Sequence, residues 1–181
     1  MKMERAAGAN GFTLIEILVV IAIVGILAGL IIPMAGNAAS NAKKRKAEME
    51  ASALKVAVAE FHRDHHYMPY GNISSGRGVV GDDKWIKTDD TDWVEMLQGE
   101  NALKKSYLSA KVQDDGKFMD PWGNPYWVGM DRNQDGYVEG NGGPSGGAGK
   151  IIRDSVGVFC LGEDGVAGTD DDVGTDSWAN D

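Results

Sequence analysis

The pattern of apolar and polar residues separates an almost uninterrupted apolar stretch from a mixed remainder. From Phe12 to Ala35 the only polar side chains are those of Thr13 and Glu16. As an α-helix this stretch would extend about 36 Å, more than the roughly 30 Å of a bilayer's hydrocarbon core. A secretory signal peptide has a shorter apolar core that ends in a small-residue cleavage site. The pattern therefore predicts a retained membrane-spanning helix over residues 12–35.

A second apolar pattern indicates that the helix resumes beyond this stretch. Apolar side chains recur at alternating spacings of four and three, which places them on one face of a helix: Ala47, Ala51, Leu54, Val58 and Phe61. His65 follows Phe61 by four residues, so we expect it to pack at the edge of the core. A packed histidine is therefore favoured over a metal site formed by His62, His65 and His66.

The remainder predicts a small α+β domain. Residues 92–98 have the pattern of a short helix that ends at Gly99. Residues 125–130 and 151–160 have the pattern of strands. Residues 136–149 contain 7 glycines and are predicted to form a loop without regular structure. The expected fold is α+β, with a long N-terminal membrane-spanning helix that continues into a small domain with an antiparallel β-sheet and long loops.

Charge and cysteine content exclude several functional classes. The 181 residues carry 18 basic and 27 acidic side chains, a net charge of −9, whereas nucleic-acid binding requires a basic surface. Cys160 is the single cysteine, so no internal disulfide can form. We expect it to be buried at the end of a strand. Because no nucleophile–base pair, phosphate-binding loop or carboxylate pair stands out, an enzyme is disfavoured.

The N-terminal residues resemble a known processing signal. Gly11-Phe12-Thr13-Leu14-Ile15-Glu16 follows a short leader with Lys2 and Arg5, and is similar to the class III signal of type IV pilins and pseudopilins. The resemblance implies that a prepilin peptidase cleaves after Gly11 and methylates the new amine of Phe12. It also implies that Glu16 neutralises the Phe12 ammonium group of a neighbouring subunit inside a filament and so sets the register.

Two further motifs resemble the major pseudopilin of type II secretion systems. Asp120-Pro121-Trp122-Gly123-Asn124-Pro125-Tyr126 has the residues of a turn, with Trp122 and Tyr126 placed to pack on the core. The same sequence is close to a signature of that family. Asp64, Tyr67 and Pro69 match the pattern that ends its long helix. The resemblance implies a pilin-like fold, whereas segments 71–90 and 131–150 lie outside it.

One acidic segment near the C-terminal end is a candidate calcium site. Residues 163–176 hold 6 acidic side chains and no basic one, and Ca²⁺ prefers six to eight oxygen ligands. The resemblance implies that Asp164, Asp171 and Asp172 are side-chain ligands, with backbone carbonyl groups completing the shell. The alternative is a flexible acidic tail.

A second acidic segment matches the first part of an EF-hand loop. Asp131, Asn133, Asp135 and Glu139 occupy the ligand positions 1, 3, 5 and 9, and glycine occupies position 6. Position 12, which requires a bidentate glutamate, is Gly142. The site is therefore incomplete, or it is completed from elsewhere in the fold. A turn between strands is the alternative.

Together these resemblances imply a structural filament subunit of a type II secretion system. The implied regions are a leader over residues 1–11, an assembly helix over 12–35 and a periplasmic domain over 36–181. The implied partners are other pseudopilins in a homo-oligomeric filament, the prepilin peptidase, an inner-membrane secretion platform and the bacterial inner membrane. Lys43–Lys46 would favour the opposite orientation by the positive-inside rule, but the leader motif is more specific. The alternative function is a type IV pilin or minor pilin for adhesion or motility.

Overall fold

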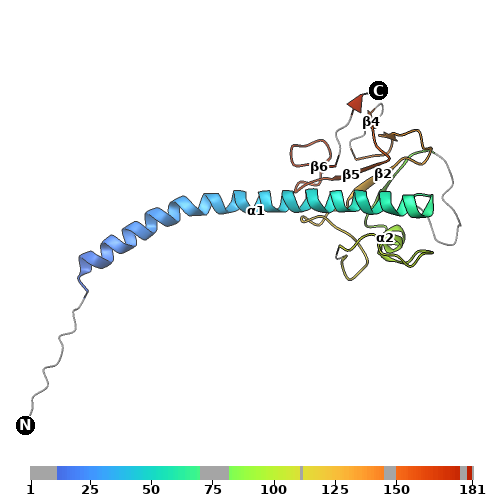
Figure 1. Ribbon diagram of the computed structural model, residues 1–181. Helices are drawn as coiled ribbons and strands as arrows, with labels where there is room; N and C mark the ends of the chain where they lie inside the picture. The colour runs from blue at the N-terminus through green and yellow to red at the C-terminus, as the bar shows by residue number, and fades with distance from the viewer. Residues whose placement is uncertain (1–11, 70–81, 111, 145–149, 176–178, 181) are drawn as a thin grey trace, which may run out of the picture. The chain divides into compact units, whose positions relative to one another are not determined.

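The structure is a computed structural model that describes residues 12–69, 82–110, 112–144, 150–175 and 179–180. Its longest element is the helix α1, Leu14–His65 (Figure 1). The chain divides into two compact units, Met1–Asn41 and Ala42–Asp181. The helix begins in the first unit and ends in the second, and each unit is described separately below.

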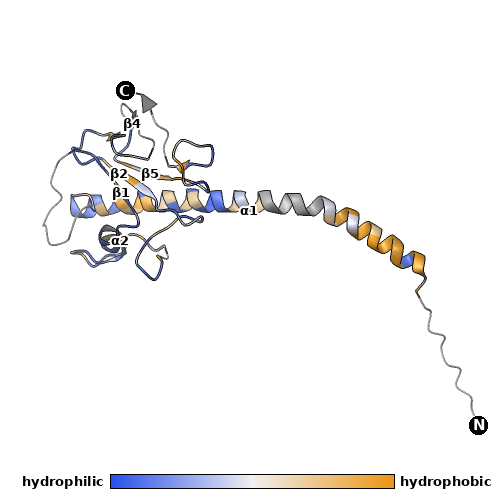
Figure 2. Cartoon of the chain, turned by 180° about the vertical axis from the view of Figure 1, so that it is seen from behind, coloured by the Kyte–Doolittle hydropathy of each residue, from blue (hydrophilic) through white to orange (hydrophobic). Residues whose placement is uncertain are grey.

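In the first unit, α1 exposes apolar side chains on all of its faces. Leu14 is 92% exposed, Ile21 is 64% exposed and Leu27 is 53% exposed. Figure 2 shows the apolar colouring of this part of the helix. Within the part of the chain that the structure describes, no helix meets the length and hydropathy that a membrane crossing requires. The span over residues 12–35 stays a prediction.

In the second unit, one face of α1 is buried in the main hydrophobic core. All five residues of the predicted stripe are fully buried, which confirms the periodicity argument: Ala47, Ala51, Leu54, Val58 and Phe61. They share one cluster with Trp93 and Leu97 of the helix α2, Thr91–Gln98, and with Val128 and Val158 of the sheet. Gly99 ends α2 with a φ of 120°, a conformation that favours glycine. The predicted short helix is therefore confirmed.

The main sheet is antiparallel and has the strand order β1-β2-β5-β6. Its strands are β1 Lys84–Lys87, β2 Trp127–Met130, β5 Val156–Cys160 and β6 Val173–Gly174. A smaller antiparallel sheet has the order β3-β4-β7. It consists of β3 Val138–Glu139, β4 Lys150–Ile152 and β7 Ala179–Asn180. The predicted α+β class with an antiparallel sheet is confirmed.

The prediction of one strand over residues 151–160 was wrong. The structure divides this segment into β4 and β5, which belong to different sheets. The polar residues 153–155 separate them, and Asp154 forms an ion pair of 2.9 Å with Lys55 of α1. The three polar residues therefore interrupt an otherwise apolar segment, and one of them is paired with α1. Four further strands were missed: β1, β6, β7, and β3 within the glycine-rich segment 136–149 that was predicted to lack regular structure.

Trp85 connects the two sheets by lying over two glycines. In the register of the main sheet, Trp85 is opposite Gly129, and Gly129 is opposite Gly157. A Cβ atom at Gly129 would lie 2.7 Å from Trp85 Cζ2 and from Val138 Cγ1. Trp85 Nε1 donates to the backbone oxygen of Glu139 in β3 at 2.7 Å. The two glycines therefore make room for an indole that holds the small sheet against the main one.

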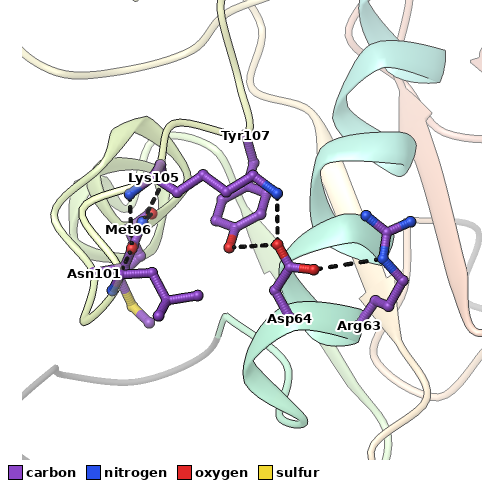
Figure 3. Close-up of polar contacts among 7 residues, drawn as sticks. Arg63, Asp64, Met96, Asn101, Lys105 and Tyr107 are labelled. Atoms are coloured by element: carbon purple, nitrogen blue, oxygen red, sulfur yellow. Dashed lines mark hydrogen bonds and ion pairs between the residues drawn. The ribbon is translucent and has the colours of Figure 1, made fainter.

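A polar contact at the end of α1 connects Asp64 to the loop that follows α2 in the chain (Figure 3). Asp64 Oδ2 accepts hydrogen bonds from Lys105 Nζ at 2.5 Å and from Tyr107 Oη at 3.1 Å. The hydrogen bond from Lys105 lowers the pKa of Asp64, and the same contact raises the pKa of Lys105. The end of the helix is thus fixed by charge as well as by apolar packing.

Asn101 shapes the loop that carries Lys105. Its side-chain nitrogen donates to the backbone oxygens of Met96 and Lys105, both at 2.7 Å. Its side-chain oxygen accepts from the N–H groups of Leu103 and Lys105. Asn101 is buried, so these bonds form away from competing water.

The histidine expectation is confirmed at the same end of α1. The His65 ring stacks on that of Phe61 with centroids 4.1 Å apart, and the side chain is partly buried. Burial lowers the pKa of His65.

Cys160 is fully buried in the core, as expected, and burial raises the pKa of its thiol to about 12.

We expect Gly129→Ala to destabilise the domain by about 1–3 kcal/mol, because the new methyl group would overlap the Trp85 ring. Thermal unfolding of the full chain in detergent, followed by tryptophan circular dichroism, measures this. The loss of stability caused by Gly129→Ala should be smaller when Trp85 is also replaced by alanine, because substitutions of residues in contact have non-additive effects. Equal costs in both backgrounds would contradict the role of Trp85.

We expect Asp64→Asn to lower the melting temperature at pH 7. The folded pKa of Asp64 lies below its ordinary value, so its stabilisation is complete above the unfolded pKa of about 3.9. It is lost as pH falls through the folded pKa. The difference between the two proteins should therefore vanish in acid. Glu100→Gln is the control, because it breaks only an exposed ion pair with Lys104 in the loop after α2, and it should change the melting temperature little. A constant Asp64→Asn deficit down to the lowest pH would rule out the charge contribution.

Candidate functional site

Glu16 and Thr13 form a capping box at the start of α1. The backbone oxygen of Thr13 accepts the first helical hydrogen bond, from Ile17 N at 3.4 Å. Glu16 Oε2 accepts from Thr13 N at 2.8 Å and from Thr13 Oγ1 at 2.7 Å. The Thr13 hydroxyl oxygen lies 3.3 Å from Glu16 N. This reciprocal arrangement satisfies backbone donors that a helix start would leave unpaired, and it fixes the Glu16 carboxylate beside the N-terminus of the helix.

The capping box places the acidic group next to the predicted new terminus. Phe12 immediately precedes Thr13 and is 81% exposed, whereas Gly11 lies outside the described residues. Both Thr13 bonds reach the same carboxylate oxygen, Oε2. The carboxylate is therefore held at the exposed end of an exposed apolar helix. This geometry is compatible with pairing to an ammonium group of another copy, which stays a prediction.

The segment from Asp120 to Tyr126 forms the expected turn. Asp120 Oδ1 accepts from the N–H groups of Trp122 at 2.9 Å and of Asn124 at 2.8 Å. Gly123 has a φ of 97°, which suits glycine at this position of the turn. Tyr126 is fully buried and Trp122 packs against the same core. Tyr126 Oη donates to Glu50 Oε2 of α1 at 2.8 Å, and burial, more than this bond, raises the pKa of Tyr126. The predicted turn and its aromatic packing are confirmed.

The acidic segment after β5 folds into a loop closed by Asp171. Asp171 Oδ2 accepts from the N–H groups of Glu163 at 2.6 Å and of Asp164 at 3.1 Å. The Thr169 hydroxyl donates to Asp171 Oδ1 at 2.5 Å, and this bond contributes most to lowering the pKa of Asp171. Asp172 Oδ2 accepts from Gly168 N at 2.6 Å. The predicted ligands thus lie on one ordered loop.

Two features of this loop fit a bound cation. The Thr169 oxygen is close to three acceptors: Asp171 Oδ1 at 2.5 Å, Val166 O at 3.1 Å and Asp164 Oδ1 at 3.4 Å. A hydroxyl group can donate to only one of them. In addition, Asp172 Oδ1 is buried and has no hydrogen-bond partner. Asp164 Oδ1 also accepts from Val166 N at 2.8 Å, so the oxygen left for a hard cation such as Ca²⁺ is the unpartnered Asp172 Oδ1.

Side chains alone do not complete a metal site in either loop. Across the described ranges, no group of three or more His, Cys, Asp or Glu side chains is arranged to hold a metal ion. A calcium shell at the Asp164–Asp172 loop would therefore need backbone carbonyl groups, as the sequence analysis expects. The assignment of Asp164, Asp171 and Asp172 as ligands stays a prediction.

The EF-hand-like segment forms a turn in which the acceptors are already used. Asp131 is buried, and its two carboxylate oxygens accept from Gln134 N at 2.6 Å and Gly136 N at 2.9 Å. Asn133 Oδ1 and Asp135 Oδ1 each accept from the N–H group two residues ahead. The Glu139 residue is exposed. These bonds explain the turn by itself, and calcium at Asp131, Asn133, Asp135 and Glu139 stays a prediction.

Asp83, which precedes β1 in the chain, also bonds to this turn. No sequence pattern predicts this contact. Its carboxylate accepts from Arg132 N at 3.1 Å and from Glu139 N at 2.7 Å. Burial, assisted by repulsion from Asp131 and Asp135, raises the pKa of Asp83. The loop is thus held from elsewhere in the fold through its backbone.

Comparison with known proteins identifies the family. Residues 7–32 match the family described as the prokaryotic N-terminal methylation motif. The type II secretion system core protein G of Aeromonas hydrophila is 29% identical over 173 residues, which cover 91% of this chain and 90% of the relative. A fimbrial protein of Neisseria meningitidis serogroup A is 31% identical over 176 residues, which cover 94% of this chain and 85% of the relative. The chain belongs to the family of type IV pilins and pseudopilins.

Other core protein G relatives match over most of the length as well. The core protein G of Pseudomonas aeruginosa is 29% identical over 172 residues, covering 94% of this chain and 96% of the relative. These comparisons confirm the resemblance carried by the N-terminal motif and by the Asp120–Tyr126 turn. The roles of Gly11, Phe12 and Glu16 and the calcium ligands stay predictions.

Some site residues could have been found from the sequence and others could not. The spacing of Thr13 and Glu16 is that of a capping box, so the role of Thr13 was readable beforehand. Asn124 is different, because its side-chain nitrogen donates to Gly162 O at 2.8 Å across 38 positions of the sequence. No pattern of neighbouring residues in the sequence predicts such a contact.

Proposed function

We propose that this pilin-family chain is the structural filament subunit of a type II secretion system. The observation that carries the proposal is the end-to-end match to core protein G relatives, which reaches 96% of the relative's length for the Pseudomonas aeruginosa protein. The signature turn from Asp120 to Tyr126 adds to it, because it is built as the sequence predicts. In this role the chain acts by assembly and performs no reaction of its own.

Assembly is proposed to depend on the first turn of α1. A prepilin peptidase would cleave after Gly11, and the exposed apolar side chains from Leu14 to Leu27 would then pack against other copies. Within that apolar packing, an ammonium group at Phe12 would need an opposite charge. Glu16 can supply it, since the capping box with Thr13 holds its carboxylate at this end of the helix. Before assembly the helix would lie in the inner membrane, with an inner-membrane platform as partner and the second unit in the periplasm.

The Asp164–Asp172 loop is proposed to hold one calcium ion that stabilises the second unit. Asp164, Asp171 and Asp172 would be its side-chain ligands. A bound Ca²⁺ supplies positive charge to carboxylates that otherwise repel one another. The buried and unpartnered Asp172 Oδ1 and the closeness of the Thr169 oxygen to both Asp164 Oδ1 and Asp171 Oδ1 support this proposal.

A type IV pilin for adhesion or motility is the second candidate. The similarity to the fimbrial protein of Neisseria meningitidis, over 94% of this chain, supports it. Many pilins of that kind close their C-terminal region with a disulfide, which the single Cys160 does not allow within one chain. The secretion subunit is therefore favoured.

A complementation experiment tests the function and the Glu16 argument together. In the source bacterium with the gene deleted, the intact chain should restore release of secreted enzymes and sheared filaments. Glu16→Ala should be cleaved at the normal rate but yield at most a tenth of the filaments, because the buried ammonium group would lack its partner. Immunoblots of precursor and filament fractions measure both effects.

Glu48→Ala is the matched control, because Glu48 is an exposed glutamate of the same helix. It should assemble normally. Restored twitching or adhesion with unchanged enzyme release would favour the type IV pilin instead. Normal filament recovery from Glu16→Ala would refute the charge-pairing argument while leaving the family role intact.

Calcium should raise the melting temperature of the full chain in detergent relative to a chelator. Linkage gives about 2.7 kcal/mol of stabilisation at a calcium concentration one hundred times the dissociation constant. Asp171→Ala should remove most of this increment, and the matched Asp135→Ala should leave it unchanged. The reverse pattern would place the ion at the Asp131–Glu139 turn. An absent increment in the unaltered chain would end the calcium proposal.

A further inference from the structure

Asn124 connects the signature turn to the acidic loop through a single side-chain hydrogen bond. Its Nδ2 atom donates to the backbone oxygen of Gly162 at 2.8 Å. Asn124 is itself fixed at both of its backbone groups: its N–H donates to Asp120 Oδ1, and its oxygen accepts from Asp120 N, each at 2.8 Å. Asp120 is buried. The Asn124 side chain thus reaches the start of the loop from a backbone that is fixed in the turn.

The bond at Gly162 also determines where the next N–H group points. The described residues contain no cis peptide bond, and in a trans peptide the C=O and N–H groups point in opposite directions within one plane. The peptide between Gly162 and Glu163 is therefore oriented by Asn124 on its C=O side. On its other side, Glu163 N donates to Asp171 Oδ2 at 2.6 Å. The orientation of one peptide plane links Asn124 to the Asp171 carboxylate.

The Asp171 side chain packs directly against the backbone of Gly162. Gly162 has a φ of 63°, and a Cβ atom added to it would lie 2.6 Å from Asp171 Cγ. On the neighbouring turn of the loop, a Cβ atom at Gly165 would lie 3.6 Å from Asn124 Oδ1. Asp171 and Asn124 are therefore packed on the glycine backbone of the same loop.

We propose that Asn124 is a positioning residue for cation binding by the acidic loop, acting through the Gly162–Glu163 peptide on the carboxylate of Asp171. The inference rests on the calcium part of the proposed function and names a residue outside the predicted ligand set. Groups that orient a ligand commonly change metal affinity by ten- to a hundredfold when removed. The signature turn then has a second role, which is to hold the loop in a binding geometry before the ion arrives.

Calcium titration of the full chain in detergent, by calorimetry and by thermal unfolding, tests the proposal. Asn124→Ala should weaken calcium affinity at least tenfold. Asn124→Asp should do the same or more, since it keeps the shape but replaces the donor with an acceptor facing the Gly162 oxygen. Asn101→Ala is the matched control, because Asn101 is a buried asparagine that also bonds to backbone groups, at the other end of the domain. It should lower the melting temperature and leave calcium affinity unchanged.

The outcomes separate this inference from the function on which it rests. Calcium binding of equal affinity in the unaltered chain and in both Asn124 variants would overturn the positioning role alone. A fall in affinity that Asn101→Ala reproduces would also overturn it, because general destabilisation would then be the cause. An unaltered chain that binds no calcium would overturn both the inference and the calcium proposal. A loss of affinity confined to the Asn124 variants is the expected result.

Discussion

The burial of one face of α1 is the interaction on which the rest of the second unit depends. Small side chains at Ala47, Ala51 and Ala57 are fully buried, so the backbone of the helix can come close to the elements that cover it. Leu54, Val58 and Phe61 fill the core beside them. Neither the short strands nor the eight-residue α2 could bury enough apolar surface alone. The helix supplies the surface on which they become stable.

Polar side chains at the edges of that face tie separate segments to the helix. Glu50 accepts from Tyr126 at the start of β2, Lys55 pairs with Asp154 between β4 and β5, and Asp64 pairs with Lys105 after α2. Near its beginning in this unit, Lys44 Nζ lies 3.3 Å from the backbone oxygen of Asp170 in the acidic loop. Each contact is modest where it is exposed. Together they decide which loop lies beside which turn of the helix.

The chain also treats its acidic residues in two different ways. Around Asp131 and Asp83 the carboxylates are used by backbone N–H groups, which makes the turn self-sufficient. In the Asp164–Asp172 loop, backbone N–H groups also bond to all three aspartates, but Asp172 Oδ1 is buried without a hydrogen-bond partner. A buried carboxylate oxygen without a partner is costly, so an ion bound at the second loop would stabilise it. Family membership and this contrast both direct the calcium proposal to the second loop.

The sequence by itself determined the features that arise from local order. The spacing of apolar residues predicts the buried stripe of α1, and Gly99 predicts the end of α2. The residues from Asp120 to Tyr126 predict the turn and carry part of the resemblance to the family. Only the tertiary structure decided that residues 151–160 divide between two sheets, that Trp85 lies over Gly129, and that Asn124 holds the Gly162 carbonyl. The physical reason is the range of the interaction. Helical periodicity and turn chemistry act between residues a few positions apart, whereas strand pairing, an indole over glycine and a side-chain bond across 38 positions exist only after the chain has closed long loops.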